Sequence, residues 1–174
     1  DLASKHGLSV WLDVALATHG TCPEWLLREF PDIRSVDRNG QRSELLATPS
    51  NPQGMHIHCY DHPAWRQYGG ALLRNVVVRY KDRPNLLIWG LWDGIGPVRP
   101  SGGRIGDTLC YCDYTLANYN NWLRERFTLN ELNDRLLRRF KCWEDVVPPR
   151  SNDNVIEMLL FRQFHYENLA NRLQ

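Results

Sequence analysis

The stretch Pro84-Asn85-Leu86-Leu87-Ile88-Trp89-Gly90-Leu91-Trp92-Asp93-Gly94-Ile95-Gly96 decides the fold of this chain. Its middle part, Leu86 to Trp92, is apolar throughout, and a polar loop rich in glycine follows it. A short apolar run without polar alternation is typical of a strand that is buried on both faces of a parallel sheet. The stretch therefore predicts a buried strand over Leu86 to Trp92, with a loop at its carboxyl end.

A second stretch of the same character lies near the amino terminus. Leu8 to Leu16 is mostly apolar, and it follows Asp1 to Gly7, which is typical of the last turns of a helix ended by glycine. Both strands should contribute to the core, as should several tryptophans. The side chains expected to be buried are Leu12, Val14, Ile88, Leu91, Trp11, Trp65 and Trp122.

The rest of the chain is predicted to be mainly helical, because apolar residues recur at spacings of three and four. The expected helices are Pro23 to Phe30, His62 to Tyr80, Asp113 to Phe127, Asn130 to Phe140 and Val155 to Leu169. Apart from its short helix, Thr18 to Gln53 is predicted to be a long loop. Helices that alternate with parallel-type strands predict an α/β fold. Two strands do not form a stable parallel sheet, so we expect the missing strands to lie outside this chain. The chain is accordingly interpreted as a piece of a domain that is truncated at both ends.

Composition limits the classes of function. The 174 residues are 43% hydrophobic and 24% charged, which indicates a globular chain long enough for one domain. A formal net charge of +1 gives no electrostatic footprint for nucleic acid. No apolar run is long enough to span a membrane. Five cysteines without regular spacing argue against a secreted disulfide scaffold and favour a cytoplasmic setting, with an extracellular one left open.

Several ordered motifs carry a resemblance to a known family. The run Pro23-Glu24-Trp25-Leu26, the motif Cys59-Tyr60-Asp61-His62-Pro63 and the motif Cys110-Tyr111-Cys112-Asp113 follow one another as in glycoside hydrolase family 42, the β-galactosidase family. The resemblance covers most of the chain. It implies an incomplete TIM (β/α)8 barrel, with residues 1–174 forming roughly the third and fourth βα units of one catalytic domain. It also implies a carbohydrate substrate, no organic cofactor, and a homo-oligomer, commonly a trimer, for the full-length protein.

The resemblance places the chemistry at the end of the strand Leu86 to Trp92. In the family, Asn-Glu stands four and five residues after a tryptophan that matches Trp89, and the glutamate is the general acid/base. This chain has Asp93 and Gly94 there. Glycine cannot donate a proton, and the nucleophile would come from a strand that this chain lacks. Asp93 is either a substitute acid or a residue that hydrogen-bonds the glycine-rich loop.

Other residues are expected around the same pocket. Trp25 and Trp92 adjoin loops at the carboxyl ends of strands, where substrate binds in such barrels, so both are candidates for facing the sugar. The family also carries an arginine shortly before the first cysteine motif, where this chain has Met55-His56-Ile57-His58. The glycine at position 94 and the missing arginine before Cys59 are two departures from the family. They favour a divergent member of the family, or an inactive member that binds carbohydrate or supports an oligomer.

The cysteines form a second constellation. The resemblance implies a structural zinc held by four cysteines, of which Cys59, Cys110 and Cys112 are present and the fourth is Thr115. Zinc prefers four nitrogen or sulfur ligands in a tetrahedron. His58 or His62 is therefore the expected fourth ligand. The alternative is three reduced thiols without a metal.

Overall fold

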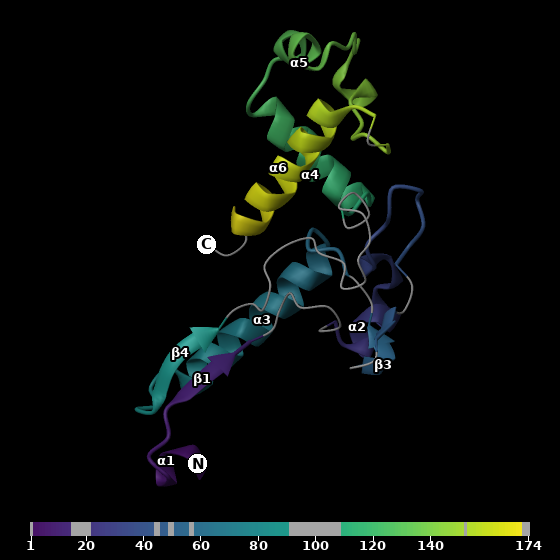
Figure 1. Cartoon of the computed structure of the whole chain (residues 1–174). Helices are drawn as coiled ribbons and strands as arrows, with labels where there is room; N and C mark the ends of the chain where they lie inside the picture. Colours follow the sequence, from purple (N-terminus) through teal and green to yellow (C-terminus); the bar gives the residue numbers. More distant parts are fainter. Residues whose placement is uncertain are drawn as a thin grey trace. The chain divides into compact units, whose positions relative to one another are not determined.

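The computed structural model describes residues 2–14, 22–43, 46–48, 51–55, 58–90, 109–151 and 153–171. Its elements, in chain order, are α1 (Leu2–Lys5), β1 (Val10–Asp13), α2 (Glu24–Glu29), the 3-10 helix η1 (Pro31–Ile33), β2 (Leu46–Thr48), β3 (Asn51–Met55), α3 (Pro63–Tyr80), β4 (Leu86–Gly90), α4 (Asp113–Arg124), α5 (Leu129–Leu136), the 3-10 helix η3 (Trp143–Asp145) and α6 (Val155–Asn171) (Figure 1). The chain divides into two compact units. The first comprises residues 1–33, 44–58 and 63–95, and the second comprises residues 34–43, 59–62 and 96–174.

In the first unit, β1 and β4 pair in parallel, as predicted (Figure 1). The register places Leu12 beside Trp89 and Asp13 beside Gly90. A hydrogen bond of 2.7 Å from the Val14 N–H to the Gly90 carbonyl continues the pairing past the last residue of β1. Both strands therefore end at the same edge of the sheet.

Two side chains approach the Cα atom of Gly90 closely at this edge. A Cβ atom at Gly90 would lie 2.5 Å from Trp11 Nε1 and 3.0 Å from Asp13 Oδ1. Real Cβ atoms do not show such a distance to a ring nitrogen, so any larger residue would displace the Trp11 indole. The missing side chain at Gly90 thus allows Trp11 and Asp13 to lie over the end of β4.

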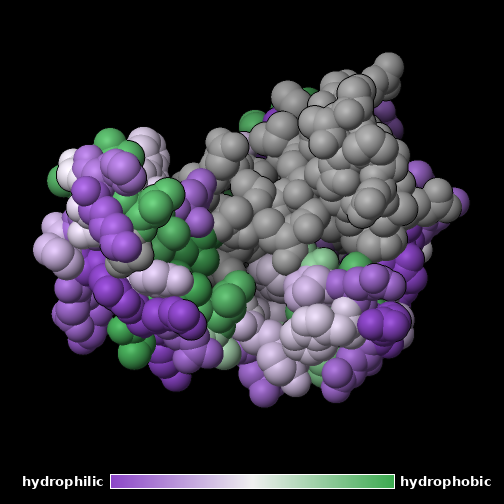
Figure 2. All heavy atoms as spheres, turned by 90° about the horizontal axis from the view of Figure 1, so that it is seen from below, coloured by the Kyte–Doolittle hydropathy of each residue, from purple (hydrophilic) through white to green (hydrophobic). Residues whose placement is uncertain are grey.

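The burial predicted for these strands is only partly correct. Val14 is buried and Leu12 is half-buried, but Ile88 is 46% exposed and Trp11 is 69% exposed. A parallel sheet buries its apolar residues only where other elements cover both faces. Among the described residues β1 and β4 have only each other as strand neighbours, and hydrophobic residues are visible at the surface among hydrophilic ones (Figure 2). Leu91 lies outside the described residues.

A hairpin occupies part of the region predicted to be a loop. β2 and β3 pair antiparallel, with Leu46 opposite Met55 and Thr48 opposite Asn51. The sequence did not predict this pairing, because β3 contains Pro52 and Gly54, and proline and glycine are both depleted in strands. Local propensity is overridden here by pairing with a neighbouring strand.

The second unit has its own core between α4, α5 and α6. Phe161 is fully buried and its ring lies 4.9 Å from that of Tyr119 and 5.0 Å from that of Tyr111. Trp122 is buried in the same cluster, as predicted, and its Nε1–H donates to Glu167 at 2.7 Å. The buried members are Leu109, Tyr111, Tyr119, Trp122, Leu123, Leu132, Leu136, Val146, Met158, Leu160, Phe161 and Phe164. The aromatic share of this core explains why α4 and α6 lie side by side (Figure 1).

The two ends of α5 differ in how favourable their backbone conformation and hydrogen bonding are. A capping box begins the helix: the Thr128 hydroxyl accepts from the Glu131 N–H at 3.3 Å, and the Glu131 carboxylate accepts from the Thr128 N–H at 2.7 Å. The C-cap residue that follows the helix is Leu137, which has a φ of 54° and is 87% exposed. A left-handed conformation is unfavourable for leucine because its Cβ approaches the backbone. The turn after α5 therefore carries local strain without any packing in return.

We expect Leu137→Gly to stabilise α5 by about 1 kcal/mol, since glycine adopts this conformation freely. Native-state hydrogen exchange of the α5 amides measures the gain. Leu137→Ala is the matched control, because it removes the exposed side chain but keeps the unfavourable φ. Equal protection in the two variants would contradict the account.

No helix among the described residues is both long enough and apolar enough to cross a membrane.

Candidate functional site

The edge where β1 and β4 end is the first candidate site. Asp13 is exposed there, beside Gly90. The predicted chemical residues Asp93 and Gly94 follow β4 by three and four positions, and they lie outside the described residues, as does Trp92. The parallel register thus defines the edge at which β4 ends, three positions before Asp93 in the sequence.

Trp25 is the predicted sugar-facing residue that the structure does describe. It lies in α2 and is 44% exposed. Its ring meets that of Tyr68 edge to face, with centroids 5.1 Å apart. The neighbouring Leu26 and Ile33 are buried and anchor α2 in the core of the first unit. Trp25 is therefore held in place on one side while part of its indole remains open to a ligand.

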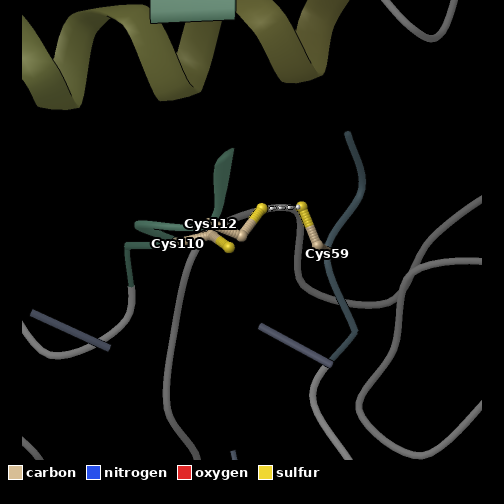
Figure 3. Close-up of side chains that lie close together, drawn as sticks. All are labelled: Cys59, Cys110 and Cys112. Carbon is tan, nitrogen blue, oxygen red and sulfur yellow. Dashed lines mark hydrogen bonds between the residues drawn. The ribbon is translucent and has the colours of Figure 1, made fainter. Parts of the chain in front are cut away.

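The second candidate site is a cluster of three buried cysteines in the second unit. The Sγ atoms of Cys59, Cys110 and Cys112 all lie within 4.8 Å of one another. Cys59 approaches the Cys110–Cys112 segment from a distant part of the sequence, and its sulfur lies 3.2 Å from that of Cys112 (Figure 3). All five cysteines of the chain carry free thiols. The convergence predicted from the sequence is therefore present.

Hydrogen bonds and burial shift the pKa values of the three thiols in different directions. The N–H of Val36 donates to Cys110 Sγ at 3.5 Å, and the N–H of Asp61 donates to Cys59 Sγ at 3.3 Å. Thiol hydrogen bonds from Cys110 and Cys59 lower the pKa of Cys112 to about 2. Hydrogen bonds with Cys110 and Cys112, together with burial, raise the pKa of Cys59. Within the cluster these contacts therefore favour the thiolate form at Cys112 over that at Cys59.

A buried carboxylate lies next to the cluster. Thr115 is fully buried, and its Oγ1 lies 3.3 Å from Cys59 Sγ and 3.4 Å from Cys112 Sγ. The Thr115 hydroxyl donates to Asp61 Oδ2 at 2.8 Å. Asp61 Oδ1 accepts from Asn118 Nδ2 at 2.7 Å and from Asn168 Nδ2 at 2.9 Å. Asp61 therefore ties the cysteine segment to α4 and α6.

The two histidines predicted as a fourth ligand are placed elsewhere. The His58 ring packs on Trp65, with centroids 3.7 Å apart, and the His62 ring meets Tyr114 at 4.8 Å. Among the described histidines, cysteines and acidic residues, the group of candidate ligand atoms contains the three thiols and neither imidazole. The structure brings Thr115 to the cluster instead.

The residues present fit a structural metal. Three thiols converge in a buried place, backbone N–H groups point at two of the sulfurs, and thiolates are the ligands that zinc prefers in such sites. Zn–S bonds of about 2.3 Å in a tetrahedron correspond to sulfur atoms roughly 3.8 Å apart. The 3.2 Å between Cys59 and Cys112 would have to widen by about 0.6 Å to admit the ion, by that reference geometry.

Sequence reasoning did not identify Asp61 as part of this arrangement. Asp61 stands two residues after Cys59, which is a weak signal, and the two asparagines that hold it are 57 and 107 residues further on. No local spacing connects them. His165 was missed as well: its Nε2 is buried without a hydrogen-bond partner, and burial lowers its pKa to about 4.

Comparison with known proteins gives the same family as the motifs. The whole chain, residues 1–174, matches glycoside hydrolase family 42, described as beta-galactosidase. β-Galactosidase BgaA of Planococcus sp. (strain 'SOS Orange') is 26% identical over 180 residues, which cover 95% of this chain and 24% of that protein. β-Galactosidase LacZ of Heyndrickxia coagulans is 27% identical over 178 residues, which cover 97% of this chain and 24% of that protein.

Solved structures agree on the fold. The β-galactosidase from Bacillus circulans sp. alkalophilus matches with a TM-score of 0.77 at 24% identity, over 98% of this chain and 24% of that chain. The chain spans about a quarter of the length of these relatives. The α/β fragment with a parallel strand pair is thus part of a TIM (β/α)8 barrel, as predicted. The chain belongs to glycoside hydrolase family 42, the β-galactosidase family.

Proposed function

We propose that the full-length protein is a retaining glycoside hydrolase of the β-galactosidase type, acting on β-galactosides or related glycans. We also propose that it is divergent at the acid/base position, and that residues 1–174 are part of one catalytic domain. The observation that carries the proposal is the parallel register, in which Asp13 and Gly90 end their strands side by side. In a (β/α)8 barrel this carboxyl edge is where the catalytic residues and the substrate meet.

The retaining mechanism needs two carboxyl groups about 5–5.5 Å apart, one as acid/base and one as nucleophile. Gly94 stands at the acid/base position, so the leaving group receives no proton from that residue. Asp93 is the candidate substitute, but its side chain is shorter by one methylene and starts one residue earlier. Catalytic geometry tolerates errors of only about 0.5 Å, which disfavours this rescue. The nucleophile is proposed to lie outside this chain.

Substrate contacts are assigned to Trp25, Trp92 and Asp93. An indole face matches the apolar C–H face of a galactose ring, and the exposed fraction of Trp25 leaves room for such stacking. Asp93 takes the place of the family's sugar-binding asparagine, and a carboxylate accepts hydrogen bonds from sugar hydroxyls.

The alternative is a protein that keeps the pocket without proton chemistry. In that case the barrel serves as a carbohydrate-binding pseudoenzyme or as the scaffold of an oligomer, such as the trimer that the family commonly forms. The loss of the glutamate at Gly94 is the observation that favours this alternative.

We further propose that Cys59, Cys110 and Cys112 hold a structural zinc, with no organic cofactor. The ion would cross-link segments that are distant in sequence, which stabilises a fold without taking part in the reaction. Free thiols at all five cysteines fit a cytoplasmic setting, because such thiols persist in reducing compartments.

The first experiment compares two substrates of the full-length protein. Lactose has an alkyl leaving group that needs protonation, so its hydrolysis should be about 10²–10⁴-fold slower than a general acid would allow. A nitrophenyl galactoside has a good leaving group and should react comparatively well, and azide should accelerate its turnover by replacing the base-assisted water. Efficient lactose cleavage that persists in Asp93→Ala would contradict the proposal. Inactivity on both substrates would favour the pseudoenzyme.

A further inference from the structure

The hydroxyl oxygen of Thr115 lies beside two of the three sulfur atoms of the cysteine cluster. Thr115 stands three residues after Cys112, so both side chains lie on one face of the first turn of α4. Its Oγ1 is 3.3 Å from Cys59 Sγ and 3.4 Å from Cys112 Sγ. We infer that the Thr115 hydroxyl, oriented by Asp61, is the fourth donor of the metal centre, which then binds its ion through three thiolates and one oxygen. This inference rests on the zinc proposed above.

The distances agree with such a centre. Tetrahedral zinc with Zn–S of about 2.3 Å and Zn–O of about 2.1 Å corresponds to sulfur and oxygen atoms roughly 3.6 Å apart. The two distances from Thr115 Oγ1 to sulfur differ from this value by about 0.2–0.3 Å on the same reference geometry. The oxygen therefore needs only a small movement to become a ligand.

Asp61 determines how the hydroxyl is presented. The Thr115 O–H donates to Asp61 Oδ2 at 2.8 Å, so the hydroxyl hydrogen points at the carboxylate and the oxygen lone pairs face the Cys59 and Cys112 sulfurs, which lie within hydrogen-bond distance. Asn118 and Asn168 both donate to Asp61 Oδ1, which holds the carboxylate as an acceptor. On metal binding the proton stays in the hydrogen bond between Thr115 and Asp61, while one lone pair of Oγ1 coordinates the ion. Such an outer carboxylate is the usual means of orienting a metal ligand.

The competing donors of the described residues are committed elsewhere. The His62 ring lies against Tyr114. The His165 ring is hydrogen-bonded to the backbone of Cys110 and packs on Phe161 and Phe164. Neither imidazole, nor any described carboxylate, belongs to the group of ligand atoms within 4.8 Å. Thr115 is therefore the donor that the geometry favours.

A changed charge follows from this donor set. Three thiolates and a neutral hydroxyl around Zn²⁺ carry a net charge of −1, whereas four thiolates carry −2. The oxygen donor also makes the site harder, so it should discriminate less strongly in favour of soft cations than a four-thiolate site does.

The test uses Zn²⁺ and Co²⁺ bound to the full-length protein. In the first arm, one ion per chain should be lost in Cys112→Ser and retained in Cys22→Ser, whose buried thiol lies in the first unit. If the parent protein binds no ion, the zinc proposal fails, and this inference fails with it. The second arm applies once binding is seen, and it tests Thr115 alone.

In the second arm, Thr115→Ser should keep the visible spectrum of the Co²⁺ protein, because it keeps the hydroxyl. Thr115→Val should weaken ion affinity by about 10–100-fold and shift the d–d bands. Thr115→Cys should raise the sulfur-to-cobalt charge-transfer band in proportion to a fourth Co–S bond. Unchanged affinity and spectrum in Thr115→Val would overturn the inference, and so would loss of the ion in His62→Phe or His165→Phe. Circular dichroism of the metal-free variants shows whether each has folded.

Discussion

Gly94→Glu in the full-length protein should raise the rate of lactose hydrolysis by about 10²–10⁴-fold, the usual contribution of a general acid. The reason is the leaving group: the glucose oxygen departs as an unfavourable alkoxide unless a carboxylic acid protonates it. A nitrophenyl galactoside should gain much less in its first step, because nitrophenolate leaves without help. The measurement is the ratio of kcat/KM for the two substrates, before and after the substitution.

Two companion variants make this result specific. Gly94→Gln has nearly the same shape as Gly94→Glu but carries no acidic proton, so it should leave lactose hydrolysis slow. Changing Asp93 to Asn together with Gly94→Glu recreates the Asn-Glu pair of the family and should do at least as well as the single change. No rescue in either glutamate variant, with sugar binding retained, would identify the protein as a carbohydrate-binding pseudoenzyme.

Phe161→Ala should destabilise the second unit by about 3–5 kcal/mol, the range for truncating a fully buried phenylalanine. The ring contacts Tyr111, Tyr119 and Phe164, so its removal leaves a cavity that rigid aromatic neighbours cannot fill. Hydrogen exchange of the α4 and α6 amides measures the loss locally, without assuming that the whole protein unfolds in one step.

Tyr166→Ala is the matched control for this change. It lies on the same helix, also removes an aromatic ring, and is 53% exposed. Its cost should be about 1 kcal/mol or less, as for other partly exposed positions. If Tyr166→Ala lowered the free energy of unfolding as much as Phe161→Ala does, the face of α6 that carries Tyr166 would be the buried one, which would contradict the structure.

The sequence predicts elements better than it predicts exposure. Apolar runs and three- and four-residue spacings located β1, β4, α3, α4 and α6 within a few residues. The same apolar runs made Trp11 and Ile88 look like core residues, because a hydrophobic pattern does not say which faces are covered. The hairpin of β2 and β3 was missed since its pairing overrides the low strand propensity of Pro52 and Gly54.

The sequence likewise predicted some parts of the candidate sites and missed others. The cysteine cluster followed from the resemblance to the family, whose cysteine motifs match Cys59, Cys110 and Cys112 in order. The hydrogen bonds of Asp61 did not, because they join residues from three segments that only the tertiary structure brings together. The roles of Asp93, Gly94 and Trp92 stay predictions from the sequence.

The proposed metal centre at Cys59, Cys110 and Cys112 would also have a topological consequence. An ion held by all three thiols would close the chain between Cys59 and Cys110 into a loop, and α3, β4 and the segment with Asp93 and Gly94 belong to that part of the sequence. A cross-link that closes a loop of about 50 residues restricts the unfolded chain by roughly 4 kcal/mol in the entropic account. Stability supplied in this way does not depend on which residues stand at the middle of the loop. Under the proposed function, a change from glutamate to glycine at position 94 would leave this contribution to stability in place, because Gly94 lies inside the loop and not at its closure.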